Sequence, residues 1–117
     1  GTDLAGTLVI PATVTTIGYE AFGASKLTGL DLSKATSLVS IADSAFLGTD
    51  LGGALVIPAK VTTIGPYAFA NTKLTGLDLS KATSLEEIDT SAFGNVKLDN
   101  IKSVVGLMDH WLDGSLA

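Results

Sequence analysis

Apolar residues recur along this chain in short clusters at regular intervals rather than in long runs. Residues 8–10 and 30–32 each carry two outer apolar side chains around a central residue. Successive side chains of a strand point to opposite faces, so the outer pair faces one way and the central residue the other. Each cluster is followed by a bend, a segment with apolar residues three positions apart, and an Ala-Phe pair. The pattern predicts short strands joined by turns.

These clusters belong to an internal repeat. The stretch at residues 27–38 returns at residues 74–85 with every position identical. Residues 1–47 and 48–94 align without a gap, and 34 of the 47 positions are identical by direct count. Each block divides again into two kinds of leucine-led unit, alternating at 23 and 24 residues. The resulting units are 4–26, 27–50, 51–73 and 74–97.

A unit of this length has one apolar side and cannot bury it alone, whereas stacked units bury a continuous core. We therefore predict a repeat solenoid over residues 1–98, with short parallel strands connected by turns or 3₁₀ segments. The Ala-Phe pairs fall in register, so we expect the phenylalanines to stack as a column: Phe22, Phe46, Phe69 and Phe93. Because the chain begins inside a unit, we expect it to be a fragment of a longer array.

Residues 99–117 depart from the repeat, and two interpretations stay open. Apolar residues at 101, 104, 105, 108 and 112 have helical spacing, which predicts a capping helix over residues 100–112 with Asn100 at its N-cap. Alternatively, residues 99–111 form an irregular unit, because residues 112–117 resemble residues 4–9, the start of a repeat. The two interpretations are compatible.

Composition excludes several functions. Hydrophobic residues make up 46% of the chain, yet no run approaches the ~20 residues of a membrane helix, so we expect no membrane insertion of this segment. The formal net charge is −5, and all seven basic residues are lysine. An acidic chain without arginine is a poor nucleic-acid binder, so we expect no nucleic-acid partner. The absence of cysteine excludes disulfides and thiolate chemistry.

Nothing in the sequence argues for catalysis. His110 and Trp111 are the only histidine and tryptophan, and no nucleophile converges on them in the repeat pattern, so we expect Trp111 to pack and His110 to lie at a solvated edge. Asp31 and Asp78 lie two coils apart, roughly 10 Å by strand spacing, which is too far to share a metal ion. We predict no enzyme, no cofactor and no metal site.

The central residues of the strand clusters form the candidate binding surface. The first kind of unit places valine there and the second kind places aspartate, with a lysine three positions later. These side chains point away from the core and are free to meet a partner. The candidate partner-binding residues are Val9, Asp31, Lys34, Val56, Asp78 and Lys81.

The pattern Ile-Pro-x-x-Val-Thr-x-Ile-Gly-x-x-Ala-Phe at residues 10–22 and 57–69 resembles the BspA-like (Treponema pallidum type) leucine-rich repeats. The resemblance covers residues 1–98 and implies a curved leucine-rich-repeat solenoid with a parallel sheet and little helix. It also implies a surface or secreted protein, located outside the cell or on its surface, that takes part in adhesion.

The sequence departs from that family pattern at two positions. In the family, a cysteine often stands three residues after the phenylalanine. This chain has small residues there, which we expect to fill the same buried slot: Ser25, Thr49, Thr72 and Val96. The asparagine or cysteine that usually follows the strand is also absent, so we expect no buried asparagine ladder.

Two functions follow from these expectations. The first is a binding module that presents its strand face to a protein or glycan ligand. The alternative is an architectural element whose repeats stack on neighbouring repeats or subunits within a larger assembly or filament. An uncapped terminal strand favours the alternative, because it offers unpaired N–H and C=O groups.

Overall fold

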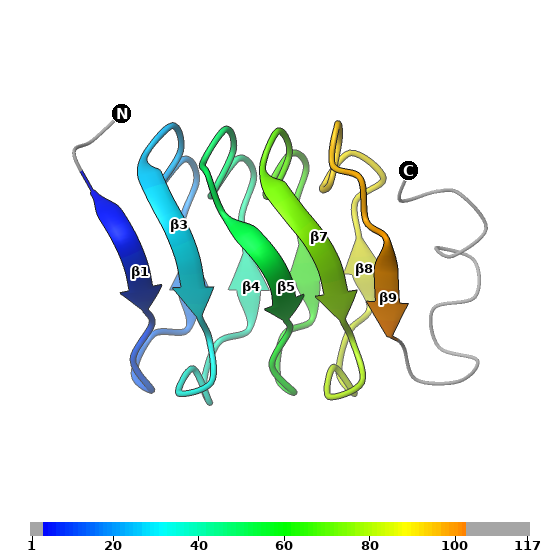
Figure 1. Cartoon of the computed structure of the whole chain (residues 1–117). Coiled ribbons are helices and arrows are strands. Elements are labelled where there is room, and N and C mark those ends of the chain that lie inside the picture. Colours follow the sequence, from blue (N-terminus) through cyan, green and yellow to red (C-terminus); the bar gives the residue numbers. More distant parts are fainter. Residues whose placement is uncertain (1–3, 103–117) are drawn as a thin grey trace.

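The computed structural model describes residues 4–102 of the 117-residue chain, and these residues form a β-solenoid of about four turns. Each coil contributes a long strand, a bend, a short strand and a turn that carries the Ala-Phe pair (Figure 1). The long strands are β1 (Ala5–Val9), β3 (Lys26–Asp31), β5 (Gly52–Val56), β7 (Lys73–Asp78) and β9 (Asn100–Lys102). The short strands are β2 (Thr16–Ile17), β4 (Ser40–Ile41), β6 (Thr63–Ile64) and β8 (Glu87–Ile88). The connections within residues 4–102 are turns and bends, without helix.

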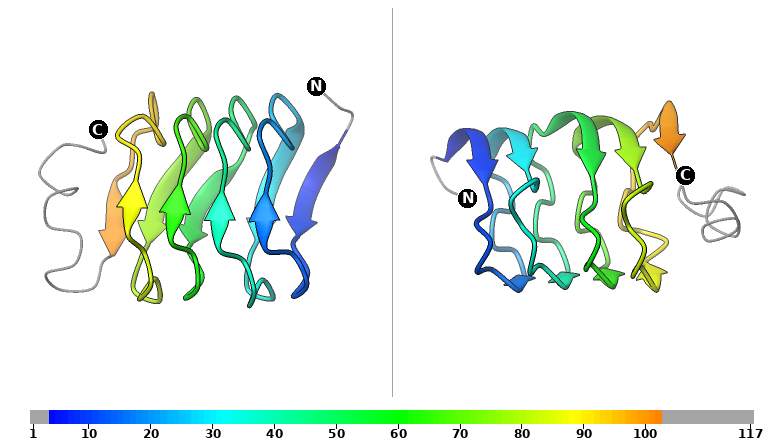
Figure 2. Two further views of the ribbon diagram at one scale, coloured as in Figure 1. Left: turned by 180° about the vertical axis from the view of Figure 1, so that it is seen from behind. Right: turned by 90° about the horizontal axis from the view of Figure 1, so that it is seen from below.

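The long and short strands form two layers that face each other across the core (Figure 2). Every strand pair is parallel. The short strands make one continuous sheet in the order β2-β4-β6-β8, and it aligns the four buried isoleucines Ile17, Ile41, Ile64 and Ile88. The long strands do not form one sheet: β1-β3 and β5-β7-β9 are separate. The predicted repeat solenoid with parallel strands is confirmed.

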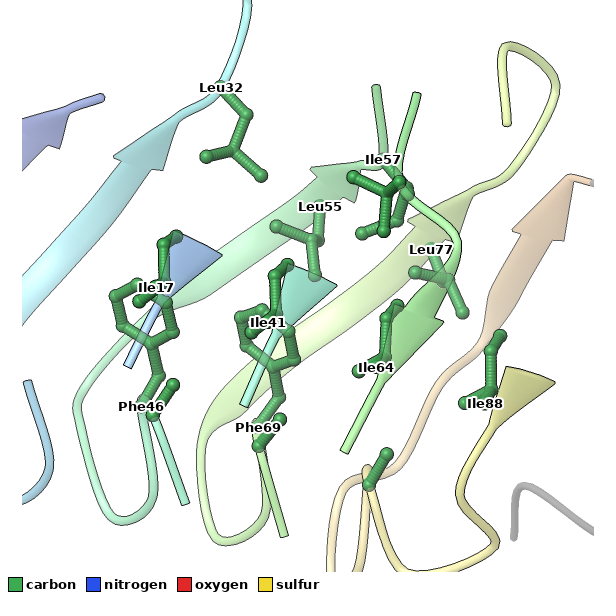
Figure 3. Packing of buried hydrophobic residues seen from close by; sticks show 14 of the residues in the cluster. Ile17, Leu32, Ile41, Phe46, Leu55, Ile57, Ile64, Phe69, Leu77 and Ile88 are labelled. Atoms are coloured by element: carbon green, nitrogen blue, oxygen red, sulfur yellow. The ribbon is translucent and has the colours of Figure 1, made fainter. Parts of the chain in front are cut away.

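The predicted phenylalanine column is present. Ring centroids of successive phenylalanines lie 5.3, 5.2 and 5.5 Å apart with interplanar angles of 13°, 7° and 9° from Phe22 to Phe93. Phe46 and Phe69 are fully buried and pack beside the isoleucines of the short-strand sheet (Figure 3). Three of the four Phe amides, those of Phe22, Phe46 and Phe69, also donate to the carbonyl of the alanine one coil further on, as from Phe46 to Ala68 at 2.7 Å. Side chain and backbone therefore bind the same neighbouring coils together.

The turn after each phenylalanine uses a left-handed residue. The residue two positions after the ring has a positive φ of 57–73° in every unit: Ala24, Gly48, Asn71 and Asn95. Asparagine tolerates this conformation better than most residues, and the Nδ2 of Asn95 donates to Oδ1 of Asn71 at 2.9 Å. Both asparagines are exposed, so this pair is not the buried ladder of other leucine-rich repeats.

The slot three positions after each phenylalanine is buried in all four units, as expected. The hydroxyl groups of Thr49 and Thr72 donate to the carbonyls of Phe46 and Phe69, at 3.0 and 2.8 Å. Ser25 carries its hydroxyl at the same place on the side chain, but its Oγ has no partner within residues 4–102. A threonine therefore fits this slot because it fills the space and satisfies its own hydroxyl.

The predicted helix is wrong at its start. Asn100 begins strand β9 instead of capping a helix, and β9 pairs with β7. The spacing from Leu98 to Ile101 equals that from Leu74 to Leu77, so this segment extends the long-strand layer. The rest of the predicted helix, residues 103–112, lies outside the described residues, as do His110 and Trp111.

Candidate interaction surface

The structure places the central residues of the long strands on the outer face of their layer. Val9 stands beside Asp31 in the register of β1 and β3, and Val56 stands beside Asp78 in that of β5 and β7. Val9 is 46% exposed and Val56 is 41% exposed. The long-strand face therefore carries two valine–aspartate pairs.

The two predicted lysines lie in the bends just beyond these pairs and are exposed. After the hydrogen bonds from Ser33, the charge of Lys34 also lowers the pKa of the Asp31 carboxyl. After the hydrogen bonds from Ser80, the charges of Lys102 and then Lys81 lower the pKa of Asp78. The six predicted residues thus form two clusters of the same composition, one on β1-β3 and one on β5-β7. The boundary between the two sheets separates the clusters.

The aspartates also hold the bends. Oδ1 of Asp31 accepts the Ser33 amide N–H at 2.9 Å and the Ser33 hydroxyl at 2.6 Å, and Asp78 makes the same pair of bonds with Ser80. These bonds, the hydroxyl first, hold the pKa of both carboxyls below the ordinary value. Asp89 repeats the arrangement with Ser91 after β8, again with a lowered pKa. We call Asp31, Asp78 and Asp89 the Asx-capping carboxylates.

The boundary between β3 and β5, which we call the seam, was not predicted. These neighbouring strands form no ladder, and their ribbons stand farther apart than the paired long strands do (Figures 1 and 2). The seam exposes Leu30, which is partly buried, whereas Leu77 at the same position of the next block is 1% exposed. The difference arises because β7 is covered by β9 while β3 has no paired neighbour on that side.

A cleft of about 560 Å³ opens at the seam. Its lining is mainly apolar and comes from β3, β5 and the bends after them, with Lys81 added from the bend after β7. The apolar lining includes Leu30, Leu32, Ala35, Ala54, Val56 and Pro58. Asp31, Lys60 and Lys81 supply the charged groups of the lining. Three of the six predicted residues therefore line the cleft, namely Asp31, Val56 and Lys81, while Val9, Lys34 and Asp78 do not.

Basic side chains gather along the carboxyl ends of the long strands, where successive units place Lys34, Lys60, Lys81 and Lys102. None of these four makes an ion pair within the described range; the ion pair found there joins Lys73 and Asp50 at 3.4 Å. Lys60 was missed by the sequence analysis, because the equivalent position of the first block is Thr13. A comparison of the segments after the long strands in all units would have found these four lysines together.

The described part of the chain offers no metal centre, since no three histidine, cysteine, aspartate or glutamate side chains gather there. Among those same residues there is also no helix with the length and apolar character to cross a membrane. The described residues instead form a surface with exposed valines, hydrogen-bonded aspartates, exposed lysines and an apolar cleft.

Comparison with known proteins identifies the family of the chain. A family model for the BspA type leucine-rich repeat region matches residues 3–107 with six copies. Neither the curated proteins nor the solved structures gave a match. The matched span covers nearly the whole 117-residue chain and contains every coil of the solenoid. The chain belongs to the BspA-type leucine-rich repeat family.

Proposed function

We propose that this chain is a non-enzymatic binding module of a surface or secreted protein, and that it adheres to a protein or glycan partner through the long-strand face. Leucine-rich repeats of this kind are protein-interaction modules, generally non-enzymatic and generally associated with cell-surface proteins. The observation that carries the proposal is the pairing of exposed valine with aspartate on neighbouring strands, Val9 with Asp31 and Val56 with Asp78.

The backbone ladder within each cluster, β1 with β3 and β5 with β7, supports binding. Side chains on a hydrogen-bonded ladder backed by a stacked core are already ordered, so a partner loses little free energy in ordering them. Exposed valine contributes apolar area, and the adjacent carboxylate and lysine contribute directional and charge complementarity. The two clusters repeat the same chemistry, so one partner with a repeated motif can contact both at once and gain from effective concentration.

A matched pair of valines tests the proposal. Val9 is 46% exposed on the long-strand face, and Val39 is 41% exposed beside the short-strand sheet. Binding of the full chain to immobilised matrix proteins and to a glycan array is measured for the Val9→Glu and Val39→Glu variants. We expect Val9→Glu to weaken adhesion about tenfold, the loss of roughly 1.4 kcal/mol, and Val39→Glu to leave it unchanged. Equal effects from the two variants, or no adhesion by the parent chain, would refute the proposal.

The alternative function is architectural, and the first long strand favours it. Within the described range β1 pairs only with β3, so its other edge offers backbone groups to a second copy or another subunit. Sedimentation of the full chain over a wide concentration range decides between the two functions. Growth of assemblies with concentration, together with indifference to Val9→Glu, supports the architectural role.

A further inference from the structure

The seam between β3 and β5 has a chemistry of its own. We propose that it binds an extended peptide of a partner protein in which an apolar side chain is followed, toward the carboxyl end, by an aspartate or glutamate. This inference rests on the proposed function, because it names a partner chemistry for one part of the same long-strand layer.

Both walls of the seam are open strand edges. Among residues 4–102, β3 pairs only with β1, and on the other side of the seam β5 pairs only with β7. At the paired junctions, the residue after each long strand donates its amide to the next strand: Ile10 to Asp31 at 3.2 Å, Ile57 to Asp78 at 3.1 Å and Leu79 to Lys102 at 2.6 Å. The equivalent amide of Leu32 donates no such bond. An added extended strand supplies the missing partners, which is how peptides join exposed sheet edges.

The seam is built into the sequence. Leu51 and Leu55 stand four positions apart, whereas Leu98 and Ile101 stand three apart. The extra residue in β5 is accommodated at Gly53, whose φ is +75°. β9, which lacks the extra residue, pairs with β7 in unbroken register from Gly76 onward. Toward the following strand the extra residue is absorbed by a bulge, and β1 pairs with β3 and β5 with β7. Toward the preceding strand the two cases differ: β5, which has the extra residue, forms no ladder with β3, and β9, which lacks it, pairs with β7.

The cleft walls match a ligand that is apolar in its middle and acidic at one end. Leu30, Leu32 and Ala54 are among the apolar groups that line it, and they suit an inward-facing aliphatic side chain. The charged lining consists of Lys60, Lys81 and the Asp31 carboxylate. Asp31 already accepts two hydrogen bonds from Ser33, so the two lysines are the groups left to attract a carboxylate.

Strand direction fixes which end of the peptide is acidic. Every pairing in the long-strand layer is parallel, so we take the added strand to run in the same direction. Its carboxyl end then lies at the bends, where Lys60 follows β5 and Lys81 follows β7. The chain itself ends β3 and β7 with aspartate, so a strand that ends in a carboxylate already fits this edge of the layer.

The test uses a synthetic strand. An acetylated, amidated peptide of sequence Lys-Leu-Thr-Gly-Leu-Asp-Leu-Ser is titrated into the full ¹⁵N-labelled chain, and its Asp→Asn counterpart serves as the matched ligand control. We expect saturable amide shifts in β3 and β5, with affinity at least threefold weaker for the Asn peptide. Lys60→Ala should weaken binding of the Asp peptide to a similar extent, whereas Lys97→Ala, an exposed lysine outside the cleft lining, should not.

Deletion of Gly53 gives the chain the three-residue spacing of the closed junction and should abolish the β3–β5 shifts. If that variant fails to fold, the two peptides and the two lysine variants still decide the question. No saturable shift up to about 2 mM peptide, shifts confined to β1 and β9, or equal binding of both peptides overturns the inference. If one of these results is found and Val9→Glu still weakens adhesion, the peptide-binding inference is wrong but the proposed function stands. The two outcomes are distinguishable because Val9 is not part of the cleft lining.

Discussion

Replacing Phe46 with alanine tests whether the phenylalanine column holds the coils together. Phe46 is fully buried, with Phe22 at 5.3 Å on one side and Phe69 at 5.2 Å on the other. Loss of its transfer free energy costs about 1.5–3 kcal/mol. A residual cavity of about 80 Å³ adds about 2 kcal/mol at ~24 cal/mol per Å³. We therefore expect a loss of about 3–5 kcal/mol in the free energy of unfolding.

Urea unfolding followed by far-UV circular dichroism measures this loss, and Phe22→Ala is the matched control. Phe22 is only partly buried and stacks on a single described neighbour, so its replacement should cost clearly less. A double-mutant cycle between Phe46 and Phe69 should show a coupling of about 0.5–1.5 kcal/mol from the ring pair. If Phe46→Ala costs less than about 1 kcal/mol, or no more than Phe22→Ala, the column does not stabilise the fold as we infer.

Two further predictions concern pH and backbone contact. The Asx-capping carboxylates have pKa values lowered from 3.8 in the folded chain, so their stabilisation is complete above that value and is lost as pH falls through the lowered folded pKa. Urea midpoints from pH 6 to 3 should fall less steeply when all three are replaced by asparagine, and an unchanged slope would count against this. A Cβ on Gly65 would lie 2.9 Å from the Asp43 backbone nitrogen, whereas at Gly18 it meets nothing within 4 Å. Gly65→Ala should therefore cost about 1–3 kcal/mol and Gly18→Ala should leave the urea midpoint unchanged or slightly raised; similar effects would contradict the coil contact.

The repeat period made the core and the outer face predictable. Strand alternation was enough to direct Leu55 inward and Val56 outward, and the fixed spacing of the Ala-Phe pairs was enough to stack the rings. These features depend on residues that occupy the same position in every unit, so each coil repeats the same local argument. The outward position of Val9, Asp31 and their repeat partners was predictable for the same reason, whereas their binding role stays a prediction.

The seam and β9 were not predictable in the same way, because both depend on pairing between coils. The four-residue spacing from Leu51 to Leu55 is visible in the sequence, but its effect appears only when β5 has to align with β3. Near Asn100 the sequence satisfies both a helical spacing and the strand spacing of Leu98 and Ile101, and pairing with β7 selects the strand. The cleft depends on the seam and was missed with it, whereas Lys60 was missed because the first block has Thr13 at that position.

The two layers of the solenoid differ mechanically. The short-strand sheet runs unbroken through four coils, whereas the long-strand layer is interrupted at the seam. A force that spreads the long strands apart meets no backbone ladder between β3 and β5, so the deformation concentrates at the seam. The paired strands β4 and β6 keep their spacing and act as the hinge. The molecule is accordingly stiff along one side and compliant along the other, and the width of the cleft responds to its curvature.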